Sequence, residues 1–383
     1  MTMGRPSIQD ETCRRLRELI ERQSLWGRQL AGERAVAGEI GVSRMTLRGA
    51  LARLEAEGLL ERRHGAGTFV RAREASGRAK RTANLAVLAY GHHESAGGWD
   101  FRGEMIRGIL GAAGAARARC TVLALDRPED AGRIADLRGL REFDGFISVG
   151  VDRHELLAGL VALRRGPVVL LDGYVRGLPV TTVVEAGYDG MRTTVRHLLG
   201  LGHRRIAFID CHNREANNPE KFAGYRSALA ERGMAVDGAL VAVPEFPDDA
   251  YAVSAEERRR SLEPFCAGAV GRFLELPDPP TAIVGFDDSR ALLALDEVER
   301  RGLRAGVDVS VAGFGDQAVR KGLCERLTSS RIYPRKMGRE ALAAATAGPG
   351  SGSGEARTVF VPTRLLARET TGPVTSRGTS PSS

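Results

Sequence analysis

The sequence predicts an α/β protein with a small basic head and a larger body of parallel sheets covered by helices. Residues 33–70 have the pattern of two short helices, a turn and a two-stranded wing. From Asn84 onward, short apolar runs alternate with amphipathic helical stretches, which is typical of βαβ units. Residues 1–83 hold 17 Lys and Arg against 10 Asp and Glu, so +7 of the total net charge of +8 belongs to the head. A basic head on a nearly neutral body indicates a nucleic-acid partner for the head alone.

The head contains a helix pair with clear start and stop signals. Residues 33–40 form a short helix, and Gly41 follows where a left-handed conformation suits glycine. Ser43 is a good N-cap for a second helix. The exposed N-terminal side of that helix presents arginines and a hydroxyl, as reading a DNA major groove requires. Its apolar residues recur at helical spacing and predict one buried stripe: Leu47, Ala50, Leu51 and Leu54.

The stretch VSRMTLRGALARLEAEGLLERRHGAGTFV, residues 42–70, closely resembles the winged helix-turn-helix of GntR-type bacterial transcription regulators. The resemblance spans most of residues 7–70 and implies a double-stranded DNA partner. Two departures from the family pattern are Gly32, where a serine is usual, and Ala66, where an arginine is usual between the wing glycines. A glycine N-cap is only slightly worse than serine, so the fold is unaffected. The implied DNA-contacting residues are Arg34, Ser43, Arg44, Thr46 and Arg48, with His64 and Gly65 at the wing tip.

Composition excludes several classes of protein. The five cysteines are scattered without a CxxC pair, which argues against a zinc site or a disulfide framework and fits a reducing cytoplasm. The N-terminus lacks the apolar region of a signal peptide, and no run of about 18 apolar residues predicts a membrane span. No GxSxG, P-loop or HExxH motif is present, so we expect neither an enzyme nor a cofactor.

About 285 residues of alternating strands and helices could form one barrel or two doubly wound lobes. Three stretches, HLLGLGHRRIAFID (197–210), KFAGYRSALAERGM (221–234) and LRAGVDVSVAGFGD (303–316), look like the LacI-type effector domain. That domain is similar to periplasmic sugar-binding proteins, so the resemblance implies two parallel-sheet lobes, joined by three crossovers, that close on a small ligand. A GntR-type head on a LacI-type body resembles arabinose-responsive repressors.

The expected domains follow from these resemblances and from composition. They are a winged helix-turn-helix head at 1–70, a basic linker at 71–83, a LacI-like ligand-binding body at 84–368 and a disordered tail at 369–383. The linker is rich in Arg, Lys, Ala and Ser, so it could lie near DNA or serve only as a solubilising spacer. The tail is rich in Thr, Ser, Pro and Gly.

Ligands of open parallel sheets bind outside the carboxyl ends of the strands, so the loops there hold the candidates. The loop after the first strand carries His92 and Trp99, and Phe101 follows it. Adjacent His92 and His93 with Glu94 suggest a metal, but adjacent histidines rarely point the same way and no third ligand fits tetrahedral spacing. We therefore expect polar residues that line a ligand cleft. Trp99 and Phe101 could stack on a sugar ring, although Phe101 also fits a helix start.

Three further candidates come from the same reasoning. Asp172 ends a buried apolar run. The resemblance places Asp287 where the family has a ligand-contacting Asn, Lys221 where it has an Arg that grips hydroxyls, and Gly315 where it has an Asp. Lysine lacks the bidentate fork of arginine, so the hydrogen-bond pattern must differ. The expected ligand is a sugar or sugar derivative held by Asp287 and Lys221, with a sugar acid or phosphate as the second choice if Lys221 pairs with an acidic group.

The sequence therefore predicts a cytoplasmic transcription regulator, a repressor, that works as a homodimer. Two heads would bind two half-sites of a pseudo-palindromic operator, and a small effector between the lobes would change operator affinity. One alternative is a sensor whose head contacts another protein, which would show no DNA affinity. Another is an architectural DNA binder, which would show affinity without sequence preference.

Overall fold

A computed structural model describes residues 8–23, 25, 28–63, 67–70, 82–90, 101–125, 138–163, 166–211, 219–244, 255–316, 325–347 and 356–374. Contacts divide the chain into two compact units, Met1–Arg81 and Thr82–Ser383, which we call the head and the body. The expected basic linker, 71–83, lies outside the described residues except for its last two. No helix among the described stretches is both long enough and apolar enough to cross a bilayer.

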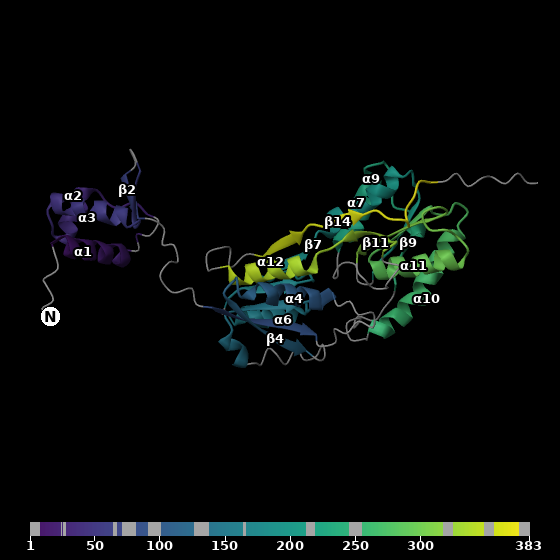
Figure 1. Cartoon of the computed structure of the whole chain (residues 1–383), viewed down its shortest axis with the longest axis horizontal. Coiled ribbons are helices and arrows are strands. Elements are labelled where there is room, and N and C mark those ends of the chain that lie inside the picture. The colour runs from purple at the N-terminus through teal and green to yellow at the C-terminus, as the bar shows by residue number, and fades with distance from the viewer. Residues whose placement is uncertain are drawn as a thin grey trace, which may run out of the picture. The chain divides into compact units, whose positions relative to one another are not determined.

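The described residues of the head form three helices and a two-stranded wing (Figure 1). They are α1 (Ile8–Arg22), α2 (Glu33–Ile40), α3 (Arg44–Ala56), β1 (Leu60–Arg63) and β2 (Gly67–Val70). The two strands pair antiparallel, and the backbone N–H of Leu30 donates to the carbonyl of Thr68 at 2.9 Å, which ties the chain before α2 to the wing. The predicted stripe of α3 is buried against α1 and α2, with Leu47 and Leu54 fully covered. Burial of this stripe fixes which face of α3 remains open.

In the part of the body that the structure describes, the strands form two six-stranded sheets, and each sheet is the centre of one lobe. The first sheet is parallel throughout, in the order β13-β7-β6-β5-β3-β4. Its strands are β3 (Ala83–Tyr90), β4 (Ala118–Leu125), β5 (Gly145–Val149), β6 (Val168–Leu171), β7 (Thr181–Glu185) and β13 (Arg357–Val361). We call this part of the body the first lobe.

The second sheet, in the second lobe, has the order β14-β12-β11-β10-β8-β9 and is parallel except for β14. Its strands are β8 (Ile206–Ile209), β9 (Val241–Ala242), β10 (Ala282–Gly285), β11 (Ser310–Gly315), β12 (Thr328–Arg331) and β14 (Arg364–Leu366). The central strands are buried on both faces, which explains their continuous apolar runs.

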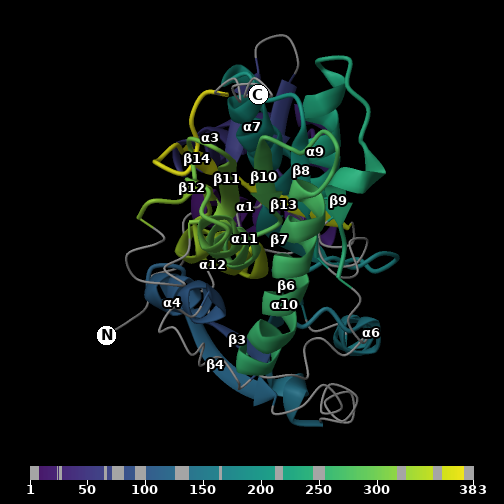
Figure 2. The same cartoon turned by 90° about the vertical axis from the view of Figure 1, so that its right-hand side faces the viewer.

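Helices cover both faces of each sheet. On the first sheet, α4 (Phe101–Ala113) and α12 (Pro334–Thr346) lie on one side, and α6 (His154–Ala162) with the short helix η1 (Arg138–Glu142) packs on the other (Figure 2). On the second sheet, α10 (Ala255–Leu274) and α11 (Asp288–Arg300) cover one face, and α7 (Gly187–Gly200) and α9 (Pro219–Ala230) cover the opposite face. The 3₁₀ turn η2 (Gly238–Leu240) leads into β9.

The chain passes between the lobes three times, as the LacI-type resemblance implies. β7 leads into α7, β12 leads into α12, and β13 leads into β14. Helix α12 packs on α4 through glycines: a Cβ at Gly108 would lie 2.3 Å from the carbonyl oxygen of Arg335, and one at Gly338 would lie 2.1 Å from that of Met105. Only glycine allows this close contact, so the returning helix is fixed tightly to the first lobe.

Several expected elements differ from the structure. The first amphipathic stretch of the body, residues 102–119, is helical only as far as Ala113, and Arg117, at φ 51°, turns the chain into β4. Of the next amphipathic stretch, which the alternating pattern predicts to be a helix over 130–142, residues 130–137 lie outside the described stretches and the rest form η1. The short strands β7, β9, β12 and β14 were not predicted. In β12 the buried residues are Thr328, Ser329 and Ser330, whose hydroxyls are hydrogen-bonded, so no apolar run marks the strand.

The expectation that a disordered tail begins at residue 369 was wrong for residues 369–374. Thr370 is fully buried, and its carbonyl accepts from the N–H of Val311 at 2.7 Å. The Gly372 carbonyl accepts from the ring of His203 at 3.0 Å. Thr370 and Gly372 form hydrogen bonds with the first two residues of β11, and composition alone does not reveal such pairing. Residues 375–383 lie outside the described stretches.

Candidate functional site

The turn between α2 and α3 is built as the sequence predicts. Gly41 has φ 71°, in the left-handed region, and its N–H donates to the carbonyl of Ala37, which ends α2. The Ser43 hydroxyl accepts the N–H of Thr46 at 3.1 Å and lies 2.7 Å from the Thr46 hydroxyl. This cap satisfies one of the free N–H groups at the start of α3. The open face of α3 therefore begins at a fixed position.

The arginines around this turn differ in whether they form an ion pair. Arg34 and Arg44 are exposed, and within the described part of the chain neither has an ion-pair partner. Arg48 is also exposed, but its Nε donates to the Glu33 carboxylate at 2.8 Å. Sequence reasoning missed Glu33 as the residue that orients Arg48. The wing-tip candidates His64 and Gly65 lie outside the described residues.

In the body, three of the predicted ligand residues come together at the carboxyl ends of strands. Lys221, at the start of α9 in the second lobe, lies 3.2 Å from Glu185, which ends β7 in the first lobe. Burial acts to raise the pKa values of Asp172, which follows β6, and Asp287, which follows β10, and the charge of Lys221 acts against that rise at both residues. These side chains therefore form one electrostatic group at which the two lobes meet. We call Asp172, Glu185, Lys221 and Asp287, with their arginine partners, the interlobe charge cluster.

Lys221 is not a free cation. Only 7% of its side chain and 8% of that of Glu185 are exposed, so the pair is almost wholly shielded from water. The ammonium also lies 4.2 Å from the ring centroids of Phe286 and of Phe314, a cation–π arrangement on both sides. Lys221 is therefore held by a carboxylate and two aromatic faces. This weakens the case for an acidic effector, which depended on an available lysine.

Asp172 has an unusual backbone as well as a charged partner. Its φ is 64°, a left-handed conformation that non-glycine residues adopt mainly where the surroundings enforce it. Its carboxylate lies 3.4 Å from Nε of Arg102, at the start of α4. Burial raises the pKa of Asp172, and Arg102 only partly opposes that rise. Gly150 allows the arrangement, since a Cβ there would lie 2.3 Å from the Arg102 guanidinium.

Asp287 is the N-cap residue of α11, and it also forms an ion pair with Arg290 of the same helix. One carboxylate oxygen accepts the N–H of Arg290 at 3.0 Å, and the other accepts from the Arg290 guanidinium at 2.6 Å. Burial alone would raise the pKa of Asp287, but Arg290 outweighs it and the net shift is downward. Arg290 also donates to the Asp210 carbonyl at 2.9 Å. Asp287 thus has a structural role in the described residues, and any contact with a ligand would be an additional one.

The structure describes only one of the three candidates around the first loop of the body. Phe101 opens α4 and packs against the cores of both lobes, as the helix-start interpretation expected. His92 and Trp99 lie outside the described residues. Among the described residues, no group of three or more His, Cys, Asp or Glu side chains could hold a metal ion. The cysteines described are unpaired.

Sequence reasoning missed Tyr174, two residues after Asp172. Its hydroxyl oxygen is completely buried and forms no hydrogen bond with a described residue. Burial raises the pKa of Tyr174, and the charges of Glu185, Glu220 and Asp172 raise it further. A buried hydroxyl without a partner is unusual and commonly indicates water or ligand. Nothing in the sequence distinguishes this tyrosine from any other residue of a polar loop.

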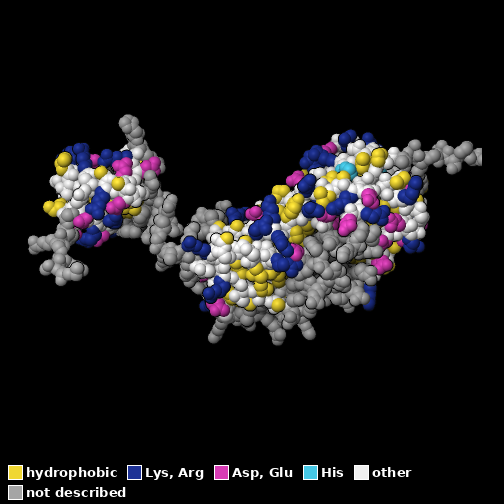
Figure 3. Space-filling view, viewed as in Figure 1, with side chains coloured by type: hydrophobic (Ala, Val, Ile, Leu, Met, Phe, Trp, Pro, Cys, Tyr) yellow, Lys and Arg dark blue, Asp and Glu magenta, His cyan; other side chains and the backbone are white. Residues whose placement is uncertain are grey.

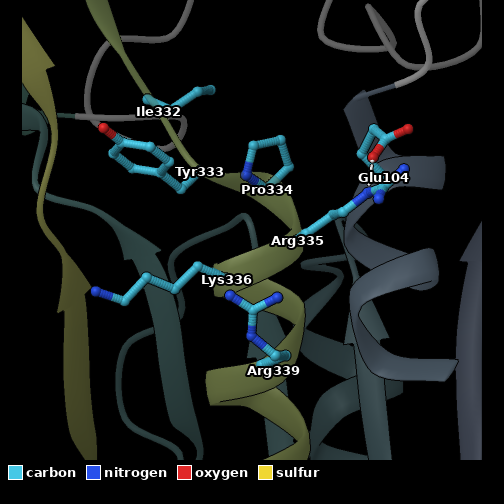
Figure 4. Close-up of a pocket in the computed structure, with 7 residues that line it drawn as sticks. All are labelled: Glu104, Ile332, Tyr333, Pro334, Arg335, Lys336 and Arg339. Atoms are coloured by element: carbon cyan, nitrogen blue, oxygen red, sulfur yellow. Dashed lines mark hydrogen bonds and ion pairs between the residues drawn. The ribbon is translucent and has the colours of Figure 1, made fainter. Parts of the chain in front are cut away.

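A separate pocket of about 280 Å³ lies at the start of α12 (Figure 4). Arg335 reaches from α12 to Glu104 on α4, and the two form an ion pair. None of the predicted ligand residues lines this pocket. On its visible face the body carries basic and acidic side chains intermixed, in keeping with its small net charge (Figure 3). The lining residues are Glu104, Ile332, Tyr333, Pro334, Arg335, Lys336 and Arg339.

Comparison with known proteins agrees with both units. Residues 8–70 match the family model "Bacterial regulatory proteins, gntR family", and residues 195–371 match "Periplasmic binding protein-like domain". The chain is 26% identical to the HTH-type transcriptional regulator DegA of Bacillus subtilis over 61% of its own length and 66% of that protein. It is 28% identical to the HTH-type transcriptional repressor CytR of Escherichia coli, over 54% of its length and 56% of that protein. The chain thus spans about half to two thirds of the curated relatives it matches.

Solved structures show the same fold. A LacI transcriptional regulator from a Rhodococcus species has a TM-score of 0.57 and 27% identity, covering 76% of this chain and 99% of that one. A complex of the transcriptional regulator CelR with cellobiose has a TM-score of 0.62 and 20% identity, covering 89% of this chain and all of that one. The relatives named here are transcription regulators. The chain joins a DNA-binding domain of the gntR family to a periplasmic-binding-protein-like domain.

Proposed function

We propose that this protein is a sequence-specific DNA-binding transcription regulator, a repressor, whose operator affinity is set by a small effector bound between the two lobes of the body. The observation that carries the proposal is the open face of α3, where Arg44 and Arg48 follow a capped turn within the gntR match. Arginine forks bind guanine edges and phosphates. The protein acts in the cytoplasm as a homodimer, so that two heads reach two half-sites.

DNA binding is tested by titrating the full chain against its own upstream promoter. Arg44→Ala and Arg48→Ala, singly and together, should weaken binding by about 1–3 kcal/mol for each arginine that reads a base. Arg300→Ala, an exposed arginine of α11 in the body, is the matched control. Equal binding by the double variant and the unchanged protein would exclude α3 as the reading helix. Binding without sequence preference would instead indicate an architectural role.

The effector site that we propose is the interlobe charge cluster together with Tyr174. Each cation in it already has a carboxylate within 3.4 Å: Lys221 has Glu185, Arg102 has Asp172 and Arg290 has Asp287. A neutral, hydroxyl-rich ligand can accept and donate hydrogen bonds there without disturbing this balance. A sugar or sugar derivative therefore suits the site better than a sugar acid or phosphate, whose charge would have to displace a carboxylate.

The effector is identified by thermal stabilisation with a matched panel of a sugar, its amino sugar and its acid. Ligand binding to the native state alone raises stability, so a true effector raises the melting temperature. Tyr174→Phe removes only the hydroxyl and should reduce that rise without changing the unliganded melting temperature much. Tyr188→Phe, whose hydroxyl bonds Ser227 between α7 and α9, is the control and should keep the full rise. Equal rises in both variants would place the site elsewhere.

Dimerisation is tested on the same protein by sedimentation at micromolar concentration. A single winged head makes few contacts with one half-site, so tight operator binding requires two heads in one particle. The expected result is a dimer with and without effector. A monomer that still binds a full operator tightly would contradict the two-fold arrangement.

A further inference from the structure

Met45 is exposed to an extent that is unusual for a large apolar residue. Its relative exposure is 75%, and among the large hydrophobic residues that the structure describes only Ile8, at 76%, is comparably exposed. Single exposed apolar residues are common on protein surfaces, so exposure by itself indicates nothing. What distinguishes Met45 is its place, because it is the second residue of α3, between Arg44 and Thr46.

The helical wheel places Met45 on the face that is open for DNA. With 3.6 residues per turn, Met45 lies roughly 170° from the centre of the buried stripe of α3. Arg44 and Arg48 are exposed on the same side, within about 100° of it. Ala52, also exposed, continues this face two turns later with a side chain too short to hold the helix away from a groove. Met45 is thus an apolar group flanked by the two arginines of the reading helix.

We propose that Met45 packs against the C5-methyl group of a thymine in the major groove and so specifies that base in each half-site. This inference rests on the proposed function. The thymine methyl is the apolar group on the major-groove edges of the base pairs, where every other feature is a hydrogen-bond donor or acceptor. Methionine is unbranched and polarisable, so it adapts to a small apolar partner. The flanking arginines would bind phosphate or guanine on either side.

The test replaces each thymine of one operator half-site, one at a time, by deoxyuridine, which removes only the methyl group. For the full chain, one position should lose about fourfold in affinity, the factor expected for one methyl group left in water. Met45→Ala removes this contact from both half-sites, so it should bind the parent operator about 16-fold more weakly and lose nothing further at that position. Met45→Leu keeps an apolar side chain and should keep the response. Ile8→Ala, equally exposed but on α1, should match the unchanged protein at every position.

The outcomes separate this inference from the proposed function. If the full chain selects no operator sequence, both fail together. If it selects an operator, but Met45→Ala shows the same deoxyuridine profile as the unchanged protein, the Met45 inference is overturned and the DNA-binding function stands. Circular dichroism confirms that the variant keeps its helices, as expected for a side chain three quarters exposed.

Discussion

The surface around the turn between α2 and α3 and the interlobe charge cluster use charged side chains differently. In the head, Arg34 and Arg44 are exposed and form no ion pair with a described residue. In the interlobe charge cluster each cation has a carboxylate partner, as the Lys221–Glu185 pair at 3.2 Å illustrates. DNA supplies its own dense negative charge, so a surface that binds it can leave cations open. A site for a small neutral molecule needs fixed geometry, and balanced charges provide it.

The largest expected effect is the loss of stability when one partner of a buried ion pair in the interlobe charge cluster is removed. Lys221→Ala removes the buried cation that lies 3.2 Å from the buried Glu185 carboxylate, which should lower the free energy of unfolding by about 3–5 kcal/mol. Urea denaturation, monitored by circular dichroism, measures this free energy of unfolding. Arg304→Ala removes an exposed pair with Asp308 and should cost at most about 1 kcal/mol. Similar losses in the two variants would mean that the buried pair is no more important than a surface one.

Operator binding and effector binding should differ in how strongly they depend on salt concentration. The logarithm of operator affinity should fall linearly with the logarithm of salt concentration, and Arg34→Ala or Arg44→Ala should each reduce the slope by about 1 per half-site, or about 2 for the homodimer, if the arginine meets phosphate. Arg44→Ala should cost about 1–3 kcal/mol if it reads a base. Effector affinity, measured by calorimetry over the same salt range, should change little because the cluster is already neutralised. A steep salt dependence of effector binding would argue against that balance.

The cap of α3 offers a smaller, local effect in the head. Ser43→Ala removes the acceptor of the Thr46 N–H and should lower head stability by about 1 kcal/mol. Ser43→Asn keeps a capping side chain and should restore most of it. Thermal unfolding of both variants is the measurement. Operator affinity should fall in Ser43→Ala and recover in Ser43→Asn, as head stability does, because the same turn positions Arg44.

The smallest expected effect is on pH dependence. His203 is buried, its Nε2–H donates to Gly372 and its Nδ1 accepts from Thr281. Burial lowers the pKa of His203, so the unfolded chain takes up a proton before the folded one. Stability should therefore fall as pH drops below about 6.5, until the folded-state pKa is reached. His203→Gln should flatten that slope, whereas His154→Gln, on the exposed start of α6, should not.

Sequence reasoning predicted most of the architecture, because the signals involved are local. Gly41 and Ser43 determine their own backbone and capping geometry, and apolar runs identify central strands. The site was predicted only in part. The loops that hold Asp172, Lys221 and Asp287 were identified, but not that Glu185 neutralises Lys221, because a contact between the two lobes depends on side chains brought together by the fold. Tyr174 was missed for the same reason: its unpartnered hydroxyl is a property of packing.

The three passages between lobes have a consequence for how the protein is made. The core face of the first sheet, with Leu85 and Val87, is covered by α12, which follows β7 by about 150 residues. At 5–20 residues per second, a ribosome needs roughly 8–30 s to add them. The head is contiguous and can fold as soon as it emerges, whereas the first lobe must wait with an apolar face open. The apolar face of the first lobe therefore stays uncovered for that interval, at a stage when the head can already have completed its own core.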